Sequence, residues 1–153
     1  MIKLIAEIGI NHNGEIGIAK KLIDAALIAG FDYVKFQKRT PHLCVPEHKK
    51  GEMKKTPWGE MTYLEYRQRI EFGEKEYDAI SEHCAAVGMG WFASAWDIPS
   101  AEFLARRCLM VKIPSAKITD DELLRYCRLH FPYLIMSTGM SSEEEVRHAI
   151  DIA

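Results

Sequence analysis

Two lysines lie inside short apolar runs that have the composition of β-strands. Lys35 belongs to the run Tyr33–Phe36, and Lys112 belongs to the run Leu109–Ile113. A single lysine in such a setting can be a surface residue whose methylene stem packs on the sheet. Two of them, both flanked by core residues near a strand end, indicate a site for an anionic ligand. Both are therefore candidate catalytic residues.

Glu7 presents the complementary charge within the apolar run Lys3–Ile8. An unpaired carboxylate buried in a strand is costly, so we expect a lysine of the same site as its partner. Glu7 is the third candidate catalytic residue. His12 follows in the next turn, and we interpret it as a loop residue that positions Glu7 rather than as a metal ligand.

The other predicted strands also end in polar residues, although a strand that is buried on both faces should end in apolar or turn residues. Hydroxyl groups and turn N–H groups at these positions can hydrogen-bond phosphate or carboxylate oxygens. The candidate substrate-binding residues are Gln37, Ser94, Ser115 and Ser137, with Asp97 and Thr138 close by. Taken alone, the Ser137–Gly139 stretch is more typical of a strand-to-helix turn that caps a helix.

Strand-like and helix-like patterns alternate five times along the chain, which predicts parallel strands joined by right-handed crossovers. The predicted strands are Lys3–Ile8, Tyr33–Phe36, Gly90–Ala93, Leu109–Ile113 and Tyr133–Met136. Helices are predicted over Ile18–Ala29 and Lys75–Val87, and capping boxes at Thr119-x-x-Glu122 and at Ser141 or Ser142 predict two more. An open, doubly wound sheet and part of a (β/α)₈ barrel both fit. The absence of glycine-rich phosphate loops weakens only the nucleotide-binding version of the open sheet.

Residues 38–73 interrupt this alternation with a long connection that contains three prolines and a predicted short helix over Thr62–Ile70. Connections of this length in compact domains are usually lids or disordered segments. This one follows the carboxyl end of a strand, where α/β folds keep their ligands. We therefore expect it to border the site.

Composition narrows the class of protein. The chain has 153 residues, of which 48% are hydrophobic and 27% are charged, as in an ordinary soluble domain. The net charge of −2 gives no electrostatic reason to expect nucleic acid or an acidic membrane as a partner. Four cysteines without CxxC spacing, and the lack of a signal-peptide pattern, favour a reduced, cytoplasmic protein.

Four segments together resemble the sialic-acid synthase (N-acetylneuraminate synthase) family. They are Ala6–Gly14 (AEIGINHNG), Val34–Gln37 (VKFQ), Lys112–Ser115 (KIPS) and Ser137–Met140 (STGM). The first is quite specific, and the shorter three gain weight from their order and their strand-end placement. The resemblance runs along nearly all of the chain.

The resemblance implies a (β/α)₈ TIM barrel, of which residues 1–153 would hold the first five β/α units. It also implies condensation of phosphoenolpyruvate with an N-acetylated amino sugar, such as N-acetylmannosamine, to a nonulosonic acid with release of phosphate. In that scheme phosphoenolpyruvate is bound by Lys35, Ser94, Lys112, Ser115 and Ser137, and Glu7 and Gln37 lie near the sugar. A divalent metal, Mn²⁺ or Mg²⁺, and a homodimer are implied for the complete enzyme.

Departures from the family pattern limit these expectations. Ser94 stands where threonine is common, and Ala116-Lys117 stands where a glycine and an acidic residue are common. The family's later barrel strands, which carry its metal-binding histidines, and its antifreeze-like domain have no counterpart in these residues. We therefore expect the metal ligands to lie outside this chain, and the chain alone to be inactive.

Two other functions fit the same residues. Lys35 or Lys112 could be the nucleophile of a Schiff-base aldolase. A five-stranded open sheet could instead bind an acidic sugar without catalysis. An incomplete barrel would expose unpaired edges at its first and fifth strands, which predicts that the isolated 153-residue chain is aggregation-prone or self-associates.

Overall fold

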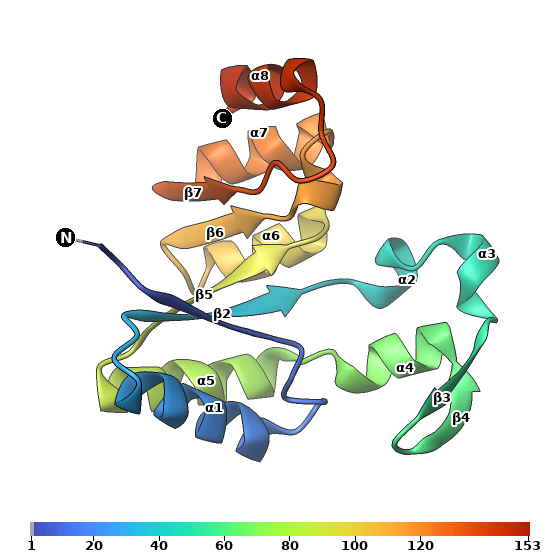
Figure 1. Cartoon of the computed structure of the whole chain (residues 1–153), viewed down its shortest axis with the longest axis vertical. Helices are drawn as coiled ribbons and strands as arrows, with labels where there is room; N and C mark the ends of the chain where they lie inside the picture. The colour runs from blue at the N-terminus through green and yellow to red at the C-terminus, as the bar shows by residue number, and fades with distance from the viewer. Residues whose placement is uncertain (1) are drawn as a thin grey trace.

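The computed structural model describes residues 2–153, and Met1 lies outside the described residues. Its centre is a five-stranded parallel sheet in the order β1-β2-β5-β6-β7 (Figure 1). The strands are β1 (Ile5–Gly9), β2 (Tyr33–Lys38), β5 (Gly90–Ala95), β6 (Met110–Ile113) and β7 (Tyr133–Met136). All five predicted strands are present, with ends shifted by up to two residues.

The strand order decides between the two predicted architectures. Strands follow one another across the sheet in the order in which they occur in the chain, with no reversal. A doubly wound sheet requires a reversal, because its helices cover both faces. Successive right-handed crossovers without a reversal place every helix on the same face, as in a (β/α)₈ barrel. The open doubly wound alternative was wrong, and the sheet is a partial barrel.

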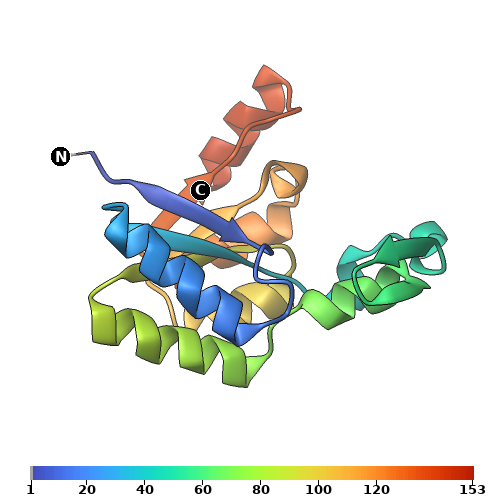
Figure 2. The ribbon, with the colours of Figure 1, turned by 60° about the horizontal axis from the view of Figure 1, so that its bottom comes forward.

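The helices that follow these strands in the chain lie one after another around the outer face of the sheet (Figures 1 and 2). They are α1 (Ile16–Ile28), α5 (Glu74–Val87), α6 (Ile98–Ala105), α7 (Asp121–His130) and α8 (Glu143–Ile152), and a 3₁₀ turn, η1 (Ser115–Lys117), precedes α7. None of the helices in residues 2–153 is long and apolar enough to cross a membrane.

Local capping explains where two of the helices begin. Ser142 and Glu145 form the predicted capping box of α8. The prediction for α7 was wrong by one residue, because the carboxylate of Asp120 accepts the N–H of Leu123 and takes the capping position expected for Thr119. An ionised carboxylate is a stronger acceptor for a helix N-terminus than a hydroxyl.

Side chains along each strand alternate between the face that packs in the core and the face that carries the candidate site. Val34 and Phe36 are fully buried, and Phe36 packs edge-on against Tyr77 of α5, so this face of β2 points toward the helices. Lys35, between them, points to the opposite face, which in a barrel is the interior. The main core therefore lies between sheet and helices, and the inner face is left for polar chemistry.

Residues 38–73 form an arm with its own secondary structure, which extends from the body of the molecule beyond β2 (Figure 2). It contains α2 (Pro41–Cys44), α3 (Glu47–Lys50), the antiparallel hairpin β3 (Met53–Thr56) and β4 (Gly59–Thr62), and α4 (Tyr63–Ile70). The predicted helix is present, and Thr62 caps it in a capping box with Glu65. The hairpin was not predicted, so the connection is more ordered than its length suggested.

Candidate active site

Three of the predicted residues are in direct contact on the inner face of the sheet. Lys35 pairs with the carboxylate of Glu7 on the neighbouring strand, and its ammonium group donates to Ser94 Oγ over 3.0 Å. The side chain of Lys35 is only 7% exposed, whereas that of Glu7 is 53% exposed. The lysine charge is therefore held in place by the protein, while the carboxylate can turn toward water or a ligand.

Lys112 supplies the second positive charge. It lies opposite Ser94 in the register of β5 and β6, so it reaches the same region as Lys35. Burial lowers the pKa of Lys112, the positive charge of Lys35 lowers it further, and Glu7 acts in the opposite direction. A lysine whose charged form is disfavoured by burial and by a second lysine is stabilised when an anion binds beside it.

Gln37 ends the polar row of β2. A Cβ atom added at Gly9, where φ is +57°, would lie 3.0 Å from Glu7 Oε1 and 3.4 Å from Gln37 Nε2. The two side chains therefore flank the same glycine at the end of β1. Glycine is needed there for its positive φ and for the space that these side chains occupy.

Ser115 and Ser137 lie at the carboxyl ends of β6 and β7. The N–H of Ser137 extends the ladder by donating to the carbonyl of Ile113 over 3.1 Å. The two loops are close, because a Cβ at Gly139 would be 3.7 Å from Ser115 Oγ. Both serines are thus on the same rim as the lysines, and neither makes a side-chain hydrogen bond to a lysine in residues 2–153.

His12 belongs to the aromatic packing beside the site and not to the cluster of charged side chains. It is 2% exposed, stacks on Phe72 with ring centroids 3.8 Å apart, and accepts the N–H of Gly14 at Nδ1. Burial lowers its pKa to about 4, so it is neutral at pH 7.

Residues 2–153 contain no group of three His, Cys, Asp or Glu side chains that could hold a metal.

One residue at this rim, Arg39, was missed from the sequence. Arg39 donates from its guanidinium to Gln37 Oε1 and stacks on Trp96, 3.8 Å from the ring centroid. The only sequence signal was the position of Arg39 two residues after Gln37, which is weak in a segment rich in basic residues.

Asp97 anchors the arm instead of lining the site. Its carboxylate caps α6 through the N–H of Ser100 and also accepts the N–H and hydroxyl of Thr40 and the thiol of Cys44. Burial opposes its ionisation, yet hydrogen bonds from Cys44, Ser100 and Thr40 outweigh burial and keep its pKa below the usual range. The carboxylate thereby joins the start of the arm to the turn after β5.

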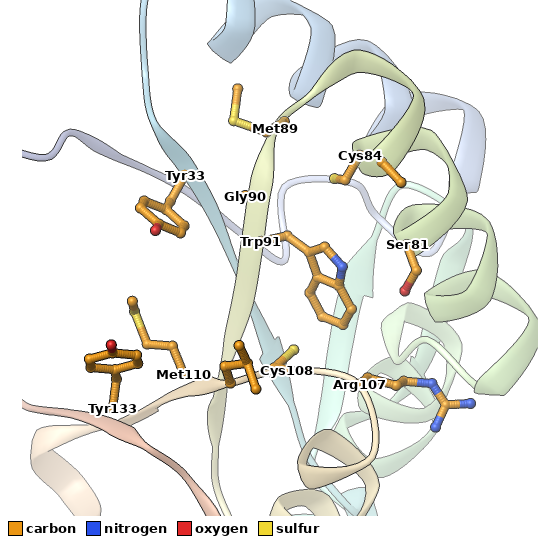
Figure 3. A pocket seen from close by; sticks show the side chains of 12 residues that line it. Tyr33, Ser81, Cys84, Met89, Gly90, Trp91, Arg107, Cys108, Met110 and Tyr133 are labelled. Atoms are coloured by element: carbon orange, nitrogen blue, oxygen red, sulfur yellow. The ribbon is translucent and has the colours of Figure 1, made fainter.

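A cavity of about 510 Å³ lies at the other end of the strands (Figure 3). Tyr33, Met110 and Tyr133, each the first residue of its strand, face Trp91 and Arg107 across β5. The guanidinium of Arg107 is already paired with Glu74 and Asp78. The cavity offers apolar surface without a free charge, so the lysine rim is the better candidate for chemistry.

Comparison with known proteins finds relatives along nearly the whole chain. The chain is 36% identical to an N,N'-diacetyllegionaminic acid synthase of Legionella pneumophila and 35% identical to an N-acetylneuraminate-9-phosphate synthase of Drosophila melanogaster. Each match covers 97% of this chain, but only 42% and 41% of the relative. The chain therefore spans less than half the length of these curated relatives.

Solved structures show the same fold. A sialic acid synthetase of Leptospira borgpetersenii, in complex with citrate, superposes with a TM-score of 0.87 at 27% identity, over 99% of this chain and 49% of that one. A 3-deoxy-D-arabino-heptulosonate 7-phosphate synthase of Thermotoga maritima, at 12% identity and a TM-score of 0.67, shares the fold alone. The NeuB family model matches residues 22–153. This chain belongs to the NeuB family.

Proposed function

We propose that this chain is the N-terminal portion of the TIM-barrel domain of a nonulosonic-acid synthase. The complete enzyme would condense phosphoenolpyruvate with an N-acetylated amino sugar, such as N-acetylmannosamine, and release phosphate. The observation that carries the proposal is the contact of Lys35 with both Glu7 and Ser94, with Lys112 alongside. The names of the relatives, which are synthases of neuraminic, legionaminic and pseudaminic acids, support it.

In this proposal Lys35 and Lys112 bind the phosphate and carboxylate groups of phosphoenolpyruvate. Ser94, Ser115 and Ser137 add hydrogen bonds from the same rim. Fixed positive charge of this kind stabilises an anionic substrate, and it costs no rearrangement when negative charge moves during the reaction. The apolar layer beneath excludes water and strengthens the effect.

The reaction forms a bond between C3 of phosphoenolpyruvate and the aldehyde carbon of the open-chain sugar. Water then adds at C2, and the C2 centre loses phosphate to leave a 2-keto acid. Glu7, whose carboxylate is half exposed beside Lys35, orients the acceptor or takes a proton, and Gln37 hydrogen-bonds the sugar. Full turnover in a Glu7→Gln variant of the complete enzyme would exclude the role of Glu7.

The same proposal places the Mn²⁺ or Mg²⁺ ligands that the family implies outside this chain. The remaining barrel strands, an antifreeze-like domain and the partner of a homodimer belong to the same proposal. All of them would come from the part of the relatives' length that this chain does not span.

The decisive experiment measures inorganic phosphate released by the complete protein from phosphoenolpyruvate, with a panel of N-acetylated amino sugars. We expect release that requires both substrates, and one sugar that is preferred. No release with any sugar, together with binding of an acidic sugar, would instead support a non-catalytic binding protein.

A Schiff-base aldolase is the second candidate, because the lowered pKa of Lys112 is a property that such a nucleophile needs. Reduction with borohydride in the presence of a 2-keto acid distinguishes the two. A synthase gives no adduct, whereas an aldolase is inactivated and gains the mass of the reduced keto acid on Lys35 or Lys112.

A further inference from the structure

Arg39 occupies the junction between the sheet and the arm. Its backbone N–H donates to the carboxylate of Glu71 over 3.1 Å, and the central carbon of its guanidinium lies over the indole of Trp96, 3.8 Å from the ring centroid. One terminal nitrogen of the guanidinium donates to the side-chain oxygen of Gln37. The residue is thus held at its backbone, by the indole and at one nitrogen, which leaves it little freedom to turn.

This contact determines which way the Gln37 amide faces. A guanidinium has only donors, so it takes the amide oxygen and forces the NH₂ group to the other side. The amide nitrogen of Gln37 then points to the end of β1, where it would lie 3.4 Å from a Cβ at Gly9, beside Glu7. Without Arg39, the amide could rotate by half a turn and present its oxygen instead.

Gln37 is also fixed at its backbone, because Tyr77 donates its hydroxyl to the Gln37 carbonyl over 2.9 Å. Its backbone pairs in register with Ser94, the hydroxyl partner of Lys35. The NH₂ group is therefore the one part of this side chain that the described residues leave available to a ligand at the rim.

We infer that Arg39 is a positioning residue, which fixes the Gln37 amide with its NH₂ group toward the acceptor sugar. The inference rests on the function proposed above and deepens it. It assigns to this position of the site an acceptor atom that receives a hydrogen bond, such as the carbonyl oxygen of an N-acetyl group. Arg39 itself acts through Gln37 and touches neither substrate.

Spectroscopy tests the positioning without catalysis. Gln37 and Gln68 are the two glutamines of the 153-residue chain, so ¹⁵N-glutamine labelling gives two side-chain NH₂ signals, and Gln37→Ala assigns them. In the Arg39→Met variant, we expect the NH₂ signals of Gln37 to move to the chemical shifts of a freely rotating amide. The NH₂ signals of Gln68 should keep their chemical shifts. Relaxation-optimised NMR spectra can be recorded even if the chain self-associates. An unchanged Gln37 pair would overturn the inference.

Kinetics of the complete synthase test the consequence. Arg39→Met keeps a long side chain on Trp96 but removes the donors, and we expect the KM for the acceptor to rise about tenfold, the effect of roughly one lost hydrogen bond. The KM for phosphoenolpyruvate should stay within about twofold. Arg69→Met is the matched control, because Arg69 stacks on Trp58 in the hairpin, 4.7 Å from the ring centroid.

A double variant separates positioning from direct contact. If Arg39 acts through Gln37, Arg39→Met adds nothing to the acceptor KM of Gln37→Ala, whereas additive effects would contradict the inference. Equal rises in both KM values would also contradict it, since they indicate general damage. If Arg39→Met does not fold, Arg39→Lys keeps one donor, and we expect an acceptor KM between those of the wild type and Gln37→Ala.

The two proposals fail in different ways. A wild-type protein that releases no phosphate with any sugar would remove the proposed synthase function, and the Gln37 signals would still decide whether Arg39 orients the amide. A working synthase in which Arg39→Met behaves as Arg69→Met does would remove the positioning role alone.

Discussion

The side chain of Lys35 is almost fully buried, whereas the side chain of its partner Glu7 is half exposed. The two ends of this ion pair therefore contribute unequally to stability. Removing Lys35 leaves a carboxylate that water can solvate, but removing Glu7 leaves a buried ammonium group with Ser94 alone. This asymmetry supports the proposed role of the pair in binding an anion.

We therefore predict that Lys35→Met leaves the melting temperature within a few degrees of the wild type but weakens phosphoenolpyruvate binding by about 100-fold or more. Titration calorimetry measures the affinity, and differential scanning calorimetry measures the melting. Lys3→Met is the control, because Lys3 pairs with Asp32 at the exposed start of β1. Equal losses of affinity in both variants would show that Lys35 has no special role.

His12 gives the folded chain a pH dependence. Its pKa is about 4 when folded, below the ordinary value of 6.5, so the unfolded chain binds the proton first. Stability is then fully present above pH 6.5 and declines as the pH falls from 6.5 to 4, by about 3 kcal/mol at most. Urea unfolding at several pH values measures this, and His12→Gln should flatten the slope, whereas exposed His48→Gln should not.

At the scale of elements, the arm is placed by buried carboxylates at its two ends. Asp97 holds its start through Thr40 and Cys44, and Glu71 holds its end through Lys38 and the N–H of Arg39. The arm therefore meets the rim of the sheet at a fixed position, although most of it extends away from the body.

We predict that Asp97→Ala lowers the free energy of unfolding by about 3 kcal/mol, because it removes a helix cap and leaves the N–H and hydroxyl of Thr40 without an acceptor. Asp120→Ala removes the more exposed cap of α7 and should cost about 1 kcal/mol. Denaturant unfolding of both variants measures the difference. Similar losses would mean that the contacts of Asp97 with the arm add nothing.

Periodicity predicted the strands and most helices, because these depend on residues that are close in the chain. The hairpin of the arm was missed, since its strands, β3 and β4, are short and polar and carry little alternation. The contact between Lys35 and Glu7 was expected from the cost of an unpaired carboxylate. The contact between Arg39 and Gln37 was not, because it depends on how Trp96 and Glu71 place the arm.

For the whole molecule, the main consequence of a partial barrel is its two open edges. In the described residues, β1 pairs only with β2 and β7 pairs only with β6. Each outer strand presents unpaired N–H and carbonyl groups, and Tyr133 on β7 is 62% exposed. In a closed barrel, neighbouring strands would cover both edges.

We predict that the 153-residue chain self-associates at micromolar concentration, and that Tyr133→Lys, which places a charge at the β7 edge, reduces this association. Sedimentation velocity across a concentration series measures both. A monodisperse, cooperatively melting monomer of the unmodified chain would contradict the prediction.

Phe92 is paired with Lys35 in the register of β2 and β5, and its ring packs edge-on against Tyr33. The two lysines thus lie above an aromatic layer of low dielectric constant, through which their field spreads poorly. The field is directed outward, from one mouth of a molecule whose net charge is −2. Capture of a small anion should then be fast and should slow as ionic strength rises, so binding kinetics measured by stopped flow would report the shape of this aromatic layer as well as the charges on it.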